Sequence, residues 1–104
     1  MFNCRQCISV RSNQNTQDDF NTLQKARLDL IGEIQAVFDY DEHINSTTNA
    51  VARSTWQNIK EEELVHIGEL LALMEYLDPT QKQFVEQGVK EFNDRLNNQR
   101  RIRD

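Results

Sequence analysis

Apolar residues recur at alternating intervals of three and four along two long stretches of this chain. The first series is Leu23, Ala26, Leu30, Glu33, Val37, Tyr40 and Ile44. The second is Ala52, Trp56, Ile59, Glu63, His66, Leu70, Leu73 and Leu77. This spacing is typical of helices that pack along one side. With one proline and three glycines in 104 residues, few positions can turn the chain, which argues against a many-stranded barrel or sandwich.

Capping residues divide the chain into three helices. Residues 45–49 contain no apolar side chain and offer several N-cap residues, so they should separate a helix that starts near Asp18 from one that ends at Leu77. Asp78, Pro79 and Gln81 then fit an N-cap, a first-turn proline and a capping-box partner. We predict an all-α fold with two long antiparallel helices and a short third helix. The buried side of the third helix should carry Phe84, Val85, Gly88, Val89, Phe92 and Leu96.

The two ends of the chain differ from the helical domain, which we place at residues 18–97. Residues 1–17 are polar and aperiodic, so we expect a flexible arm. Its Cys4 and Cys7 form half of a zinc site, and a free or redox-active pair fits them better. Residues 98–104 are expected to be a solvated basic tail. The net charge of −5 and the lack of a long apolar run predict a cytoplasmic protein that binds neither nucleic acid nor membrane.

Three polar residues, Glu33, Glu63 and His66, interrupt the apolar series. Burying an unpaired carboxylate or imidazolium is costly, so something must compensate these groups. Glu63 and His66 form Glu-x-x-His, a spacing that lets both side chains reach one metal ion. If the helices turn near Thr47, Glu33 and Glu63 both lie roughly 21–24 Å from the tip, at the same level. Tyr40 follows Glu33 by about two turns, which is close enough for an outer neighbour of the site, although a plain core aromatic is the simpler interpretation.

This ligand set is half of the set found in diiron four-helix bundles. Such bundles take a Glu from each of two helices and a Glu-x-x-His from each of the other two. One chain supplies only one of each. A symmetric pair of chains would supply four carboxylates and two imidazoles. We therefore predict a homodimer that forms a ferritin-like four-helix bundle with the metal site at its interface.

The segment of residues 32–41, GEIQAVFDYD, followed by residues 61–66, EEELVH, resembles the encapsulated ferritins. The likeness covers roughly residues 20–97. It implies a ferroxidase that oxidises Fe(II) with O₂ at a site holding two irons per dimer, with Glu33, Glu63 and His66 as ligands and Tyr40 as a neighbour. It also implies a ring such as a decamer, working inside an encapsulin shell for iron storage or detoxification.

The sequence also departs from that family. Gly32 and Gln35 replace the acidic residues that usually flank the first ligand, and no shell-targeting peptide is visible after Asn97. Two other functions stay open. One is a rubrerythrin-like diiron peroxidase, and the other is a non-catalytic helical assembly module in which the Glu–His pair only fixes register.

Four further residues have simpler interpretations. Trp56 is expected to pack in the core, and Glu61 and Glu62 to face solvent. His43 is expected to be solvated, although with Asp39 and Glu42 it could form a weak secondary metal site.

Overall fold

The computed structural model describes residues 9–103, with side chains from Gln17 to Ile102. These residues form three helices and no strand: α1 (Ser9–Asn45), α2 (Ala50–Leu77) and α3 (Pro79–Arg103). The predicted all-helical fold is confirmed. Within this part of the chain, no helix carries an apolar stretch long enough to cross a lipid bilayer.

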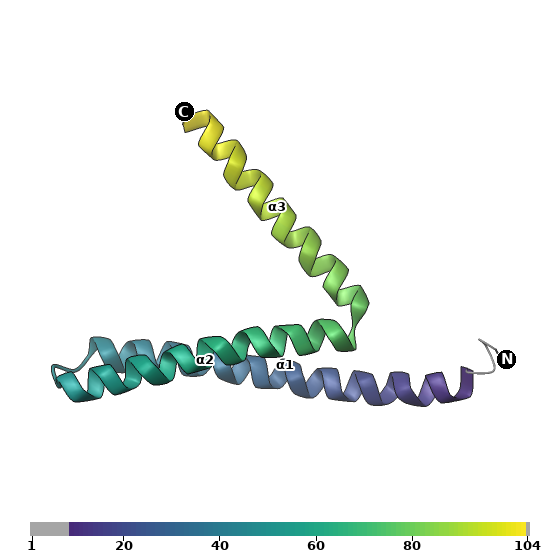
Figure 1. Cartoon of the computed structure of the whole chain (residues 1–104), viewed down its shortest axis with the longest axis horizontal. Coiled ribbons are helices and arrows are strands. Elements are labelled where there is room, and N and C mark those ends of the chain that lie inside the picture. The colour runs from purple at the N-terminus through teal and green to yellow at the C-terminus, as the bar shows by residue number, and fades with distance from the viewer. Residues whose placement is uncertain (1–8, 104) are drawn as a thin grey trace.

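The helices α1 and α2 form a long antiparallel hairpin (Figure 1). The turn between them ends at Asn49, whose side chain accepts a hydrogen bond from the Ala52 amide at 2.9 Å. The Thr47 hydroxyl accepts from the Asn49 amide at 3.1 Å. These side chains satisfy amides that a helix start leaves unpaired, so the predicted boundary at residues 45–49 is confirmed.

The first helix begins earlier than the sequence pattern indicates. We placed its start near Asp18, but α1 begins at Ser9. Residues 9–17 contain no proline or glycine, so nothing in them prevents the helix from extending. Periodicity predicts only the part of a helix that packs, which explains the difference of nine residues.

The core of the isolated chain is small. Only Leu23, Ala26 and Met74 are buried among the described apolar side chains, with Leu30 and Leu77 packed against them. The radius of gyration is 20.3 Å, against about 13 Å for a compact domain of this length. The isolated chain therefore keeps many large apolar side chains exposed.

A sharp corner at Asp78 joins α2 to α3. The Asp78 amide donates to the Met74 carbonyl at 3.0 Å, and its carboxylate accepts from the Thr80 amide at 3.1 Å. The predicted N-cap is therefore confirmed. The predicted capping-box role of Gln81 is wrong, because its side-chain oxygen accepts from the Arg27 guanidinium of α1 at 2.8 Å. This bond ties the start of α3 to the hairpin.

Beyond this corner, α3 extends away from the hairpin (Figure 1). It is 25 residues long, so it is not the short helix we predicted, and it includes most of the expected basic tail. The side predicted to be buried is exposed in the chain, because the described residues provide no helix to cover it: Phe84, Val85, Gly88, Val89, Phe92 and Leu96.

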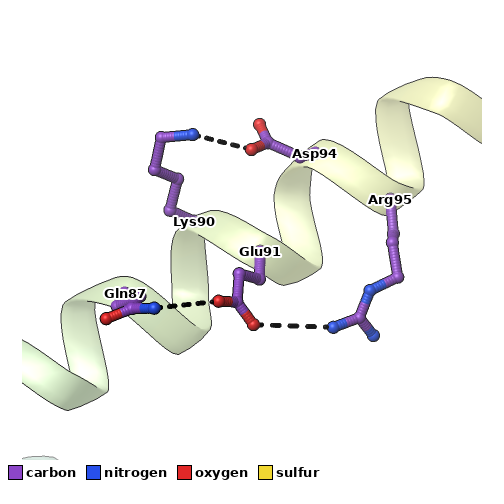
Figure 2. A network of polar contacts seen from close by, with 5 residues as sticks. All are labelled: Gln87, Lys90, Glu91, Asp94 and Arg95. Atoms are coloured by element: carbon purple, nitrogen blue, oxygen red, sulfur yellow. Dashed lines mark hydrogen bonds and ion pairs between the residues drawn. The ribbon is translucent and has the colours of Figure 1, made fainter.

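A ladder of polar contacts runs along α3 (Figure 2). Gln87 donates to Glu91 at 3.1 Å, and Lys90 lies 2.7 Å from the Asp94 carboxylate. Arg95 lies 3.8 Å from Glu91. Contacts between residues four apart stabilise a solvated helix, which helps α3 persist without a neighbour along its length.

Candidate metal centre

The hairpin brings together the three polar residues singled out by the sequence. Glu33 comes from the middle of α1, and Glu63 and His66 come from α2. One possible ligand atom from each lies within 4.8 Å of the other two. The predicted equal level of Glu33 and Glu63 is therefore confirmed. An ion pair at 2.6 Å between Lys60 of α2 and Asp41 of α1 links the two helices two turns further toward the tip.

The contacts inside this triad leave one carboxylate oxygen without a partner. His66 Nδ1 and Glu63 Oε1 form a hydrogen bond of 3.1 Å. The same nitrogen lies 3.6 Å from Glu33 Oε1, which is too far for a hydrogen bond. Glu33 Oε1 is nonetheless buried, and among the described residues it has no hydrogen-bond partner. A buried acceptor without a donor is costly unless a cation binds it.

Both glutamates influence the protonation of His66. Partial desolvation lowers the pKa of the imidazole, but the negative charge of Glu33 and the hydrogen bond with Glu63 raise it more. The net result is a pKa above the ordinary 6.5. A metal cation that binds Nδ1 would compete with a proton on this nitrogen.

The triad opens onto a surface groove between α1 and α2. The groove has an apolar part formed by three leucines and a polar part formed by the triad and two further acids. Its lining is Leu28, Asp29, Gly32, Glu33, Glu63, His66, Glu69, Leu70 and Leu73. We refer to this side of the hairpin as the groove face.

Asp29 and Glu69 also line the groove, although the sequence pattern did not single them out. Asp29 precedes Glu33 by four residues, and Glu69 follows His66 by three, so one helical turn separates each from a ligand. That spacing would have identified both. They supply negative charge inside the groove although Gly32 and Gln35 stand where the resembling family has acids.

The donor set suits a first-row divalent cation. Two carboxylates and one imidazole match iron, manganese or zinc, and their ligand atoms lie within 4.8 Å of one another. Three protein ligands leave coordination positions free for water, substrate or ligands from another chain. The orphaned oxygen of Glu33 and the convergence of the donors thus fit a metal site that one chain does not complete.

The predicted neighbours of the site lie nearer the hairpin tip. Tyr40 is half-buried and outside the groove lining, with its ring 6.2 Å from that of His43. His43 is exposed, as expected, and its ring also lies edge-on to that of Trp56 at 4.9 Å. Glu61 and Glu62 are exposed, as expected. Cys4 and Cys7 lie outside the described residues.

Comparisons with models of known protein families, with curated proteins and with solved structures found no match for this chain. The resemblance to encapsulated ferritins therefore stays a prediction from the residues.

Proposed function

We propose that two copies of this chain pair through their groove faces and oxidise Fe(II) with O₂ at a shared diiron site. The observation that carries the proposal is the convergence of Glu33, Glu63 and His66 within 4.8 Å around a buried carboxylate oxygen that lacks a hydrogen bond. Such a set, doubled by a two-fold axis, has the ligand composition of a diiron four-helix bundle.

Pairing of two hairpins is also favoured by the surface that one chain exposes. Its accessible area is 8141 Å². A compact monomer of 12.3 kDa exposes about 6,100 Å². The excess of about 2,000 Å² is well above the roughly 800 Å² that each partner buries in a standard interface. Leu28, Leu70 and Leu73 offer apolar contacts beside the metal ligands.

Each residue has a defined role in this proposal. Glu33 and Glu63 bind or bridge the two ferrous ions, which are the substrate. His66, once it has lost its proton, gives one nitrogen to each ion. Two ions held side by side supply two electrons, so they can reduce one O₂ to H₂O₂ with the uptake of two protons. Asp29 and Glu69 attract cations into the groove by their negative charge.

Aerobic iron loading tests the proposal. We expect about one iron per chain by elemental analysis and rapid Fe(II) oxidation by the wild-type protein. Glu63→Ala and His66→Ala should each lose at least about 100-fold in oxidation rate while keeping their helical circular dichroism. Glu61→Ala is the matched control, because this exposed acid of the same helix lies away from the groove lining. Iron well below one per chain would contradict the diiron site, and unfolding of both variants would favour a structural pair.

The choice of oxidant separates ferroxidase from peroxidase. With Fe(II) loaded anaerobically, O₂ should oxidise the site faster than H₂O₂ at equal concentration. A faster reaction with H₂O₂ would instead favour the rubrerythrin-like alternative.

Ring assembly and an encapsulin shell belong to the same proposal. They are supported by the resemblance of residues 32–41 and 61–66 to encapsulated ferritins. Co-purification of the chain inside a co-expressed encapsulin shell would test that part, and exclusion of the chain from the shell would contradict it.

A further inference from the structure

Two rows of side chains with the same spacing run along α1 and α3. Both rows advance by four, three and four residues, which keeps their members on one side of a helix. We refer to them as the α1 row, which is Arg27, Ile31, Ile34 and Phe38, and the α3 row, which is Gln81, Val85, Gly88 and Phe92.

A hydrogen bond joins the first members of the two rows. The Arg27 guanidinium donates to the side-chain oxygen of Gln81 at 2.8 Å, and the contact is partly buried. Because each row lies along one side of its helix, the α3 row starts on the side of α3 that faces α1. The two rows are thus in contact at the corner and separate as α3 leaves the hairpin (Figure 1).

The directions of the helices keep the two rows in register. Because α1 and α3 are both antiparallel to α2 in chain direction, they run in the same general sense (Figure 1). The bonded pair is separated by 54 residues, and two helices with the same rise per residue keep that offset along their lengths. The later members of the rows therefore match level by level: Ile31 with Val85, Ile34 with Gly88, and Phe38 with Phe92.

The later members of both rows are apolar or small, and they are exposed in this structure. Phe38 is 58% exposed and Phe92 is 61% exposed, so the largest side chains of the two rows are both in water. Gly88 has open space around it, since an added Cβ atom would meet nothing within 4 Å. A bulky isoleucine on one row therefore faces a position without a side chain on the other, which allows close packing.

The net charges of the hairpin and α3 have opposite signs. Residues 9–77 contain twelve acidic and five basic side chains, a net charge of −7. Residues 79–103 contain three acidic and six basic side chains, a net charge of +3. Approach of α3 to its own hairpin is therefore favoured by electrostatics as well as by the apolar rows.

A single residue connects the two parts. Asp78 lies between the end of α2 at Leu77 and the start of α3 at Pro79, with φ −139° and ψ 90°. A rotation about its ψ angle would change the direction of the whole of α3, while the bond from the Asp78 amide to the Met74 carbonyl stays in place. Single residues at the ends of helices serve as hinges in this way.

We propose that Asp78 is a hinge about which α3 closes onto the α1 row of its own chain. The structure shows the open state, in which only Arg27 and Gln81 of the two rows are in contact. In the closed state the remaining members pack in the same register and form a three-helix arrangement within one chain. Closure hides apolar side chains from water while the chain is unpaired, and it needs neither iron nor a second copy.

Disulfide trapping in the iron-free protein tests the closed state. Phe38→Cys and Phe92→Cys are combined in a chain whose native thiols are removed by Cys4→Ser and Cys7→Ser, because a disulfide forms only when the two Cα atoms come within about 7 Å. The matched control pairs Phe92→Cys with Gly32→Cys, which lies in the groove lining. We expect a link within one chain that forms at least ten-fold faster than in the control.

Mass spectrometry on a 1:1 mixture of ¹⁵N-labelled and unlabelled chains separates links within a chain from links between chains. Links of mixed isotope content, or a rate no greater than that of the control, would overturn the proposal.

Small-angle X-ray scattering tests closure without a covalent link. Extrapolated to zero concentration, the iron-free wild-type protein should have a radius of gyration below the 20.3 Å of the open state. Phe38→Glu places a charge between the two rows, so its radius should return toward that value. Val51→Glu, which alters an exposed valine outside both rows, is the matched control and should behave as wild type.

Circular dichroism verifies that each variant stays helical. Equal radii for wild type and Phe38→Glu would overturn the hinge and leave the diiron site untouched, because that site is tested by iron loading.

Discussion

The groove face and the opposite side of the hairpin belong to the same two helices, but they differ in the chemistry that they leave unsatisfied. We refer to the exposed apolar residues of that opposite side as the apolar face: Ile31, Ile34, Phe38, Leu64 and Leu71. The groove face keeps a buried carboxylate oxygen of Glu33 without a hydrogen bond beside the hydrogen-bonded pair Glu63 and His66. The apolar face leaves only hydrocarbon in water. A cation would satisfy the first deficit, and an apolar neighbour would satisfy the second. The two sides of one hairpin therefore differ in the kind of partner that would stabilise them.

Glu33→Leu should have the largest effect on the groove face. Glu33→Leu removes a ligand, so iron oxidation should fall at least about 100-fold. The same change removes the orphaned buried carboxylate, so at pH 8 the free energy of unfolding of the iron-free protein should rise by about 1 kcal/mol. Oxidation kinetics and chemical denaturation measure the two effects.

The control for this variant is Glu42→Leu, an exposed acid of the same helix. It should leave iron oxidation unchanged. A clear loss of stability in Glu33→Leu would show that the carboxylate serves the fold and would contradict a site kept for a cation.

Gly32→Phe should block the groove without unfolding the chain. A Cβ atom added at Gly32 meets nothing within 4 Å, and a phenylalanine suits a helix better than glycine. A second hairpin placed over the groove would meet the new ring. We expect iron-dependent pairing and iron oxidation to fall at least about ten-fold, while thermal stability of the iron-free protein stays equal or rises.

Gly68→Phe is the matched control for this variant. Gly68 is also open, but it projects about 140° from Glu63, on the side of the apolar face. Its iron oxidation should match that of wild type. Equal behaviour of the two variants would contradict pairing through the groove.

The sequence predicted those parts of the molecule that depend on spacing within one chain. The turn at residues 45–49, the end of α2 at Leu77 and the level of Glu33 and Glu63 follow from helical periodicity and capping. The predicted burial of the apolar side of α3 is wrong for the isolated chain. Apolar spacing indicates that Phe84 and Phe92 favour burial, but it does not indicate which molecule they pack against. The start of α1 at Ser9 was not predicted for a related reason. A part of a helix that packs against nothing does not need apolar residues at regular intervals.

Loss of the ion pair between Lys60 and Asp41 should have a smaller effect on stability and on iron oxidation. Lys60→Met breaks a contact of 2.6 Å that is partly exposed, with side-chain exposures of 22% and 48%. Because solvent screens such a pair, we expect a loss of up to about 1 kcal/mol in unfolding free energy. Iron oxidation should change less than about two-fold, since the triad has its own contacts. A ten-fold loss of oxidation would show that this pair sets the register of the metal ligands.

The smallest effect concerns the proton on His66. Its pKa stands above 6.5 because the charge of Glu33 and the hydrogen bond with Glu63 outweigh the opposing effect of desolvation. A raised pKa in the folded chain stabilises the fold fully below the unfolded pKa and loses that contribution as the pH rises through the folded value. Above that value Nδ1 is free, so iron binding should tighten over the same pH range in which the iron-free chain loses stability. NMR titration of iron-free protein should place the midpoint of His66 above 6.5, and Glu63→Gln should lower it because the amide carries no charge. A midpoint at or below 6.5 in the wild-type protein would contradict the raised pKa of His66 and the expected link between iron binding and pH.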